Sequence, residues 1–192
     1  MSLKSSIKYS ETEITEILLK NTLLMIEERK LLKKKDHSKN LKNLYNQIKD
    51  DMLFVISDSK LKIGIRIVKY KVTSVTKVEG IDQFLNDKSY DYKIVIFKDM
   101  NQKTFKQLIS YPNTQPFWEN ELMMNIIEHN YVPKHYVLSE NERVEFIKSY
   151  QITRDVLPKI EIYDPITRYY NMKIGDIVKI TRNNAISGEE IY

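Results

Sequence analysis

The chain has 192 residues, of which 42% are hydrophobic, so it can fill the core of one large domain or two small ones. It has no cysteine and three histidines without helical pair spacing, which excludes disulfides and thiolate zinc sites and leaves no metal cofactor to expect. No segment resembles a signal peptide or approaches the roughly 20 apolar residues of a membrane span. We therefore expect a soluble, intracellular protein that binds no membrane.

The net charge of +5 is concentrated near the N-terminus. Residues 1–50 carry +4, residues 51–132 carry +1 and residues 133–192 are neutral. Most of the excess lies between Arg29 and Lys42, where seven cations face only Asp36. Such a run is usually a solvated surface, and the alternative is an electrostatic contact with nucleic-acid phosphates.

Two helices are predicted in the first fifty residues. Ser10-Glu11-Thr12-Glu13 fits a capping box, and apolar residues at helical spacing continue from there to Leu32. The basic run at the end of this helix complements the helix dipole. Residues 41–48 repeat the helical spacing and predict a second, shorter helix with Ser38 or Asn40 as its cap.

The pattern then becomes that of strands. Residues 63–72 alternate between apolar and polar with one change of register, and residues 93–98 form a short, mostly buried strand. Helical turns are predicted at residues 81–85 and 104–109, and a last strand at residues 117–127. The first 130 residues thus read as one α/β unit.

The last sixty residues predict a second, smaller unit. Ser139-Glu140-Asn141-Glu142 is another capping box, which opens a helix whose expected buried side is Val144, Phe146, Ile147 and Tyr150. A strand is predicted at residues 159–163, and Asp164-Pro165 is a typical helix start. After a turn at Gly175, Ile177, Val178 and Ile180 form a strand, and Ser187-Gly188 turns the chain into an edge strand at residues 190–192.

Several motifs follow one another in this unit. They are Val132-Pro133-Lys134-His135, Leu157-Pro158-Lys159-Ile160, Asp164-Pro165 with Arg168, and Gly175-Asp176-Ile177-Val178-Lys179-Ile180 with Arg182 and Ser187-Gly188. In this order they resemble the C-terminal assembly domain of the fifth subunit shared by the eukaryotic RNA polymerases, which has counterparts in the archaeal and large DNA virus enzymes. The family usually has glycine where Asn171 stands, and asparagine tolerates the same left-handed conformation.

The resemblance implies an α+β protein with two domains. Residues 1–131 would form an N-terminal α/β jaw domain, a long helix plus a mixed sheet, and residues 132–192 a small α/β assembly domain. The chain would be a non-catalytic subunit of a DNA-directed RNA polymerase, without a cofactor or a small-molecule substrate. The assembly domain would dock on the largest polymerase subunit and meet other subunits, and the jaw would lie beside the downstream DNA duplex.

The resemblance also carries over two sets of residues. Lys98 and Lys103 bracket the turn after the strand at residues 93–98, at the jaw's DNA-side loop, and are predicted to lie nearest the duplex. The expected assembly interface consists of Pro133, Lys134, His135, Pro158, Asp164, Pro165, Arg168, Gly175, Val178, Ile180, Arg182 and Gly188.

Two other functions are open alternatives. Asp91-Tyr92-Lys93 with Glu79 upstream is reminiscent of metal-dependent nucleases, in which carboxylates hold magnesium and a lysine steadies the attacking water. Such triplets arise by chance in a chain with 31 cations and 26 anions. A free-standing nucleic-acid-binding transcription factor is the second alternative, although it would need a stronger basic face.

The composition also suggests a source. Lysine far exceeds arginine and Ala185 is the one alanine, which is typical of AT-rich coding DNA. The loop at residues 182–186 is closer to the polymerase counterparts of large cytoplasmic DNA viruses such as poxviruses. We expect a viral protein of the cytoplasm or virion, and the nucleus would be the location if the source were a eukaryotic host.

Overall fold

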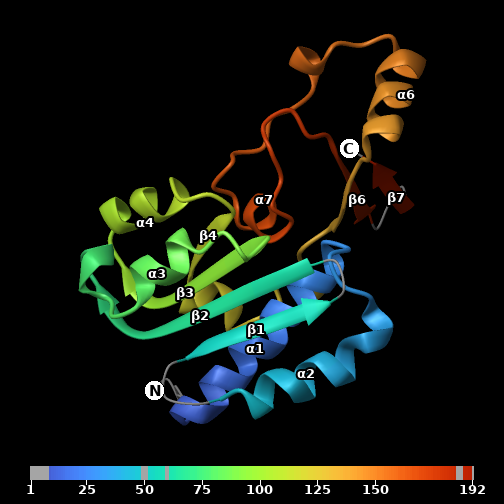
Figure 1. Cartoon of the computed structure of the whole chain (residues 1–192). Coiled ribbons are helices and arrows are strands. Elements are labelled where there is room, and N and C mark those ends of the chain that lie inside the picture. Colours follow the sequence, from blue (N-terminus) through green and yellow to red (C-terminus); the bar gives the residue numbers. More distant parts are fainter. Residues whose placement is uncertain (1–8, 49–51, 59–60, 185–187, 192) are drawn as a thin grey trace, which may run out of the picture. The chain divides into compact units, whose positions relative to one another are not determined.

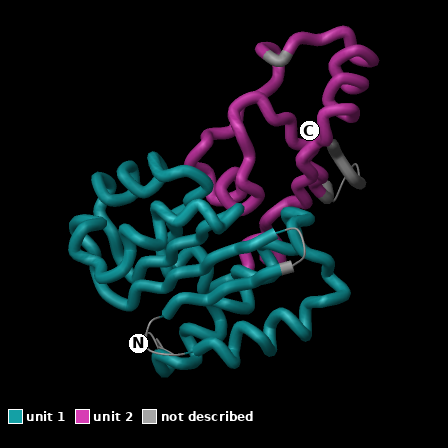
Figure 2. Tube along the Cα trace, in the orientation of Figure 1, with its two compact units in different colours: residues 1–124 teal, residues 125–192 magenta. Residues whose placement is uncertain are grey.

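The chain divides into two compact units, coloured separately in Figure 2. Unit 1 is Met1–Met124 and unit 2 is Asn125–Tyr192, whereas the motifs place a boundary between residues 131 and 132. The computed structural model describes residues 9–48, 52–58, 61–184 and 188–191. Helices are combined with a mixed sheet and an antiparallel sheet along these residues, so the predicted α+β class is confirmed.

Unit 1 opens with helix α1, Glu11–Glu28, which begins at the predicted capping box. The Ser10 hydroxyl accepts a hydrogen bond from the Glu13 amide at 3.2 Å, and the Glu13 carboxylate accepts one from the Ser10 amide at 2.7 Å. The hydrogen bonds that the Ser10 amide and the Ser10 hydroxyl donate to the Glu13 carboxylate lower the pKa of Glu13. The helix ends a turn before the predicted Leu32, because the backbone reverses at Lys30, where φ is 60°.

The basic run therefore follows α1 instead of lying in its last turn. It forms the short helix η1, Lys34–Asp36, and leads into α2, His37–Asn46. Asp36 precedes α2, so the predicted caps Ser38 and Asn40 are wrong, since both lie inside the helix. The buried Glu27 carboxylate lies 2.9 Å from His37 Nδ1 and joins the two helices.

Four strands form the sheet of unit 1 in the order β1-β2-β3-β4. They are β1, Leu53–Asp58; β2, Leu61–Val72; β3, Tyr92–Met100; and β4, Thr114–Trp118. β1 and β2 pair antiparallel, and β2, β3 and β4 are parallel. The register of β2 against β3 shifts between Val68 and Lys71, which confirms the predicted change.

The parallel strands are joined by helices that cross over one face of the sheet. α3, Ile81–Asn86, follows the short helix η2, Val75–Lys77, and α4, Gln102–Ile109, connects β3 to β4. Figure 1 shows α3 and α4 on this face and α1 and α2 on the other. Both predicted helical turns are thus confirmed, and the sheet is buried on both sides.

The predicted strand at residues 117–127 is mostly wrong. β4 ends at Trp118, and the chain continues as α5, Glu119–Leu122, and η3, Ile126–Glu128. The Trp118 amide donates a hydrogen bond to the Glu121 carboxylate at 2.8 Å, which closes a helical turn. Good helix formers at these positions therefore override the apolar run.

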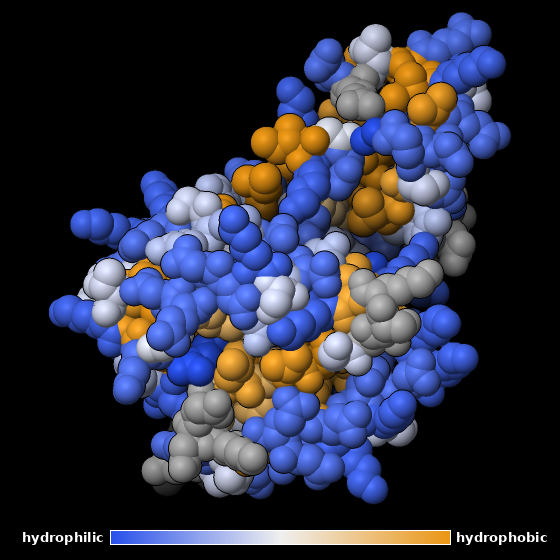
Figure 3. Space-filling model, viewed as in Figure 1, coloured by the Kyte–Doolittle hydropathy of each residue, from blue (hydrophilic) through white to orange (hydrophobic). Residues whose placement is uncertain are grey.

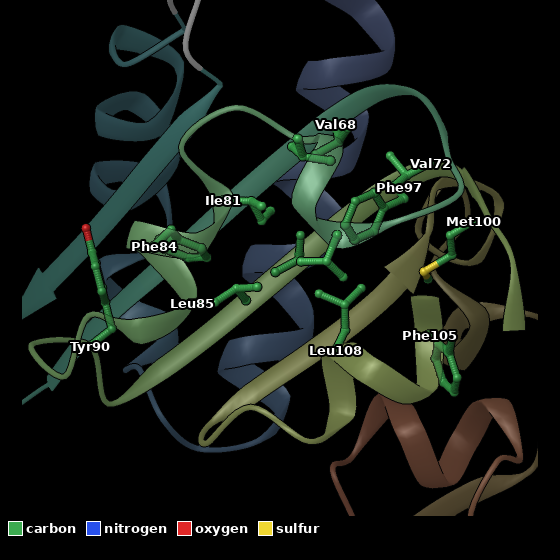
Figure 4. Packing of buried hydrophobic residues seen from close by; sticks show 13 residues of the cluster. Val68, Val72, Ile81, Phe84, Leu85, Tyr90, Phe97, Met100, Phe105 and Leu108 are labelled. Atoms are coloured by element: carbon green, nitrogen blue, oxygen red, sulfur yellow. The ribbon is translucent and has the colours of Figure 1, made fainter. Parts of the chain in front are cut away.

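The core depends on β3, whose residues 93–97 are all buried. Side chains alternate across the strand, so Ile94 and Ile96 face α1 while Val95 and Phe97 join the cluster under α3 and α4. Figure 4 shows this cluster, which also contains Phe84, Leu85, Phe105 and Leu108. Burial of both faces by apolar side chains is typical of a parallel sheet.

One lysine lies inside this apolar strand. The side chain of Lys93 is 2% exposed, and its Nζ donates a hydrogen bond to the Leu85 carbonyl near the end of α3. Burial lowers the pKa of Lys93, and the nearby Asp87 opposes that shift only in part. The ammonium group therefore satisfies a helix-end carbonyl at the cost of desolvation.

Unit 2 contains a second sheet, in the order β5-β6-β7. Its strands are β5, Lys134–Val137; β6, Val178–Asn184; and β7, Gly188–Ile191, and both pairings are antiparallel. The strand predicted around Val178 is confirmed. Ser187 and Tyr192 of the predicted terminal turn and edge strand lie outside the described residues.

The helices of unit 2 begin where the sequence predicts. α6, Glu140–Tyr150, starts at the capping box of Ser139 and Glu142, and α7, Pro165–Tyr169, starts after Asp164. η4, Arg154–Val156, lies between them. Asn171 has a φ of 53°, the left-handed conformation expected of it.

Two other predictions for unit 2 are wrong. The expected buried side of α6 is only half-buried at Phe146 and Ile147 and is exposed at Val144 and Tyr150. Residues 159–163 form no strand, although their alternating pattern favours one. In both segments none of the apolar side chains is fully buried among the described residues.

Replacing Lys93 with methionine should remove a pH dependence of stability. The pKa of Lys93 is lower in the folded chain than its ordinary value of 10.5, so the unfolded chain binds more protons between these two values. The unfolding free energy of the parent chain should therefore rise with pH in that window relative to Lys93→Met. Urea unfolding of both chains from neutral to alkaline pH measures the difference, and a flat or falling difference would contradict the buried ammonium.

Replacing Gly64 with alanine should destabilise unit 1 by about 1–3 kcal/mol, the usual cost of overpacking. A Cβ atom there would lie 2.6 Å from the Phe84 ring and 3.0 Å from the Tyr90 ring. Thermal unfolding measures the loss, and a second substitution, Phe84→Leu, provides the control because it removes the ring. The combined loss should be smaller than the sum of the single losses, and strict additivity would refute the steric cause.

Candidate functional site

The motifs of unit 2 that lie far apart in the sequence are adjacent in the sheet. β5 carries Lys134 and His135, and His135 pairs with Ile180 of β6. Val137 pairs with Val178 in the same ladder. His135 Nδ1 lies 2.7 Å from the Pro133 carbonyl, which can only accept, so Nδ1 carries the proton in this hydrogen bond.

Other motif residues shape the backbone. The Asp164 carboxylate accepts a hydrogen bond from the Ile166 amide at 2.8 Å, and Pro165 occupies the first helical position of α7. Gly175 has a φ of 93°, which a residue with a Cβ atom rarely adopts. Its carbonyl accepts a hydrogen bond from Arg143 of α6 at 3.1 Å, so the turn before β6 is tied to that helix.

The remaining candidate residues lie at the surface or outside the sheet. Pro158 is exposed in the irregular segment between η4 and α7, and Arg182 is exposed on β6. Arg168 is half-buried in α7. Gly188 begins β7, where it pairs with Asn184. The candidate interface is therefore a strand ladder with capped turns beside it.

Unit 2 presents an unusual amount of apolar surface, which sequence reasoning missed. Among its described residues, the buried hydrophobic side chains are Tyr169 and Met172. Ile174 is 92% exposed and Val144 is 57% exposed. The other large apolar residues at the surface are Tyr131, Tyr136, Tyr150, Val156, Ile160, Ile162 and Tyr163. Figure 3 shows hydrophobic residues gathered at the surface beside α6, among hydrophilic ones.

This exposure has a physical meaning. A unit of this size normally stabilises itself by burying apolar side chains, and unit 2 buries few of them in its described residues. Exposed apolar groups that gather on one unit are typical of an interaction surface. The helical spacing in α6 predicted a buried side, and it could not show that Val144 and Tyr150 on that side are exposed.

Lys98 and Lys103 lie on either side of one capped turn in unit 1. Lys98 is exposed near the end of β3, and Lys103 is exposed in the first turn of α4. Between them, the Asn101 side chain accepts a hydrogen bond from the Thr104 amide at 2.7 Å and donates one to the Thr73 carbonyl. The turn that carries both lysines is thus held to the end of β2.

The residues of the nuclease-like motif serve the fold instead. The Asp91 carboxylate accepts a hydrogen bond from the Lys62 amide at 2.7 Å, and the Lys93 ammonium group is buried against Leu85. Across the described parts of the chain, no group of three or more His, Asp and Glu side chains could hold a metal ion. Nor does any described helix have the length and apolar character to cross a membrane.

Comparison of the sequence with known proteins identifies the family of this chain. Residues 124–192 match the model of the RNA polymerase Rpb5 C-terminal domain. A Caenorhabditis elegans protein named DNA-directed RNA polymerases I, II, and III subunit RPABC1 is 30% identical over 151 residues, 77% of this chain and 67% of its own length. DNA-directed RNA polymerase subunit 5 of Acanthamoeba polyphaga mimivirus is 28% identical over 95% of this chain and 91% of its own. The chain therefore belongs to the RNA polymerase subunit 5 family, whose members are non-catalytic polymerase subunits.

Proposed function

We propose that the chain enters its polymerase through unit 2, which docks on the largest subunit, and that unit 1 is the jaw beside the downstream DNA. The observation that carries the docking proposal is the apolar surface of unit 2, where Ile174 and Val144 are exposed. Unit 2 also contains all but the first residue of the region matched by the family model. Residues 133–192 are neutral overall, which suits protein docking better than binding to phosphates.

The strand ladder offers a second mode of contact. β5 and β7 are the edges of the described sheet of unit 2. An exposed edge strand can accept a strand from another chain, because its unpaired amides and carbonyls form a ready template. Docking through this unit would therefore combine apolar burial with backbone hydrogen bonds.

Unit 1 is the part suited to lie beside DNA. It holds the positive net charge of the chain, and Lys98 and Lys103 are exposed at a rigid turn. Lysines at such a position attract phosphates without reading the base sequence. A jaw of this kind would support the clamp around the duplex and would add no chemical step.

The relatives bear on where the polymerase works. The mimivirus protein covers nearly the whole chain, and the lysine-rich composition is typical of AT-rich coding DNA. These observations favour a polymerase of a large DNA virus, located in the cytoplasm or the virion. A eukaryotic host enzyme, with the nucleus as its location, is the second candidate because the nematode relative is 30% identical.

Charged substitutions on the apolar surface of unit 2 should prevent assembly. Ile174→Asp and Val144→Asp each place a carboxylate where a partner would exclude water, and burying an unpaired charge is costly. We expect each variant to reduce, at least tenfold, the amount of the chain that co-purifies with a tagged largest subunit. The measurement is quantitative pull-down from cells that express all polymerase subunits.

The matched control is Ile109→Asp in unit 1, where the parent residue is 45% exposed. This variant should co-purify like the parent chain, and all three variants should keep the parent's circular dichroism. A chain of residues 1–131 alone should also fail to co-purify. Normal recovery of both unit 2 variants would refute docking through this surface.

Placing a photocrosslinker at position 98 or 103 should label downstream DNA in an assembled elongation complex. The turn that holds these positions is rigid, so a crosslinker there samples a small volume around it. Position 148, on exposed Lys148 of α6, is the control and should label protein rather than DNA. Equal labelling of DNA from positions 98, 103 and 148 would contradict the proposed role of the turn.

A further inference from the structure

The surface formed by η1 and the outer side of α2 carries most of the chain's charge excess. We call it the η1–α2 surface and define it by eight exposed residues: Lys33, Lys34, Lys35, Ser38, Lys39, Lys42, Asn43 and Asn46. Residues 33–48 contain five lysines and one acidic residue, so this short segment holds +4 of the chain's net +5. The proposed DNA contact of the turn that carries Lys98 and Lys103 does not account for this charge excess.

The outer side of α2 has no anion of its own to balance its lysines. Surface helices usually mix both signs of charge at neighbouring helical positions, whereas residues 37–48 contain neither aspartate nor glutamate. Exposed positions that are not lysine hold serine or asparagine, which donate hydrogen bonds without negative charge. Lys34 of η1 differs from the lysines of α2, since it forms an ion pair with Glu28.

The inner side of α2 is fixed to the body of unit 1. Leu44 is fully buried, and His37 contacts the buried Glu27 of α1. Just after the helix, the Gln47 side chain donates a hydrogen bond to the Val55 carbonyl and accepts one from the Val55 amide, at 3.0 and 2.7 Å. The lysines of the outer side therefore extend from a rigid support and cannot turn into the core.

The other basic positions of unit 1 lie closer to acidic groups. β2 carries four cations and no acidic residue, but its Lys69 and Lys71 form ion pairs with Glu11 and Asp99. Residues 75–110 contain six lysines and five acidic residues. Near the jaw turn, Lys71 lies 2.7 Å from the Asp99 carboxylate and lowers the pKa of Asp99. α2 and α4 lie on opposite faces of the sheet, so the η1–α2 surface is separate from the turn of Lys98 and Lys103 (Figure 1).

The chemistry of the surface favours a nucleic acid over a protein. Protein interfaces usually contain exposed aromatic or aliphatic anchors, and between residues 30 and 48 the described chain exposes no large hydrophobic side chain. Lysine, serine and asparagine are side chains that contact phosphate and sugar. A ten-residue helix is about 15 Å long, which matches four to five base-pair steps of duplex DNA.

We propose that the η1–α2 surface binds the phosphate backbone of duplex DNA without reading its sequence. This inference rests on the proposed position of unit 1 beside DNA and adds a second contact to it. The duplex would meet α2 through its phosphates, with Lys35, Lys39 and Lys42 as the principal cations. A polymerase subunit with contacts on two faces of its jaw could hold DNA over a longer path than the turn alone.

The test compares two triple variants of the full chain that have the same net charge. The first is Lys35→Gln/Lys39→Gln/Lys42→Gln, and the control is Lys77→Gln/Lys88→Gln/Lys106→Gln, in which all three parent residues are exposed. Fluorescence anisotropy with a labelled duplex of about 25 base pairs, over a range of low salt concentrations, gives the affinity and its salt dependence. Glutamine keeps good helix propensity, and circular dichroism verifies the fold of both variants.

We expect the first variant to bind at least tenfold more weakly at low salt, while the control stays within about threefold of the parent. Removing three phosphate contacts should also lower the slope of log affinity against log salt by about 2.7. Equal losses in both variants, or no binding by the parent chain, would overturn the inference. So would a loss of binding to poly-glutamate in the first variant while its DNA binding is unchanged, since the surface would then fit an acidic protein.

This test is independent of the assembly experiment. It uses the free chain, so a failure of unit 2 to dock would leave the anisotropy result unchanged. Conversely, both triple variants keep unit 2 intact and should co-purify with the polymerase like the parent chain. A DNA-binding loss with normal co-purification would assign the effect to the η1–α2 surface alone.

Discussion

The burial of β3 on both of its faces is the constraint on which unit 1 depends. Five consecutive residues of this strand are buried, and they require helices on both sides of the sheet. α1 and α2 cover one side, and the crossover helices α3 and α4 cover the other (Figure 1). Because each crossover links parallel strands, the turn after β3 is fixed by the same packing. Charged side chains at the surface of unit 1 therefore extend from helices and turns whose backbone is already ordered by this packing.

Unit 2 follows a different principle. Its turns and helix starts are well specified locally, since Ser139 and Asp164 cap their helices and Gly175 adopts a conformation suited to glycine. Its described residues nevertheless bury little apolar surface, with Tyr169 and Met172 as their buried hydrophobic side chains. Local interactions therefore fix the backbone conformation of unit 2. Its exposed apolar side chains can still contribute free energy by becoming buried when a partner binds. That division is what a subunit needs if it is to be held by a larger assembly.

Electrostatics separates the two units as clearly as packing does. The excess positive charge is confined to unit 1, and most of it lies on η1 and the outer side of α2, a helix that is anchored by Leu44 and Gln47. Charge that is fixed on a rigid support attracts phosphates more effectively than a mobile run of the same composition, because less side-chain and backbone entropy is lost on binding. Replacing the exposed lysines of η1 and α2 should leave the stability of the fold unchanged, since these side chains do not pack in the hydrophobic core.

By itself, the sequence determined the features that depend on neighbouring residues. Capping residues placed the starts of α1, α6 and α7, alternation placed β2 with its register change, and the ordered motifs of the last sixty residues identified the polymerase family. Only the tertiary structure decided which apolar residues are covered. Val144 of α6 is exposed although its helical spacing predicts burial, and residues 159–163 alternate like a strand but do not form one. The physical reason is that hydrophobic periodicity identifies the apolar face of a helix or strand. Which segment covers that face depends on contacts with distant parts of the chain or with another chain.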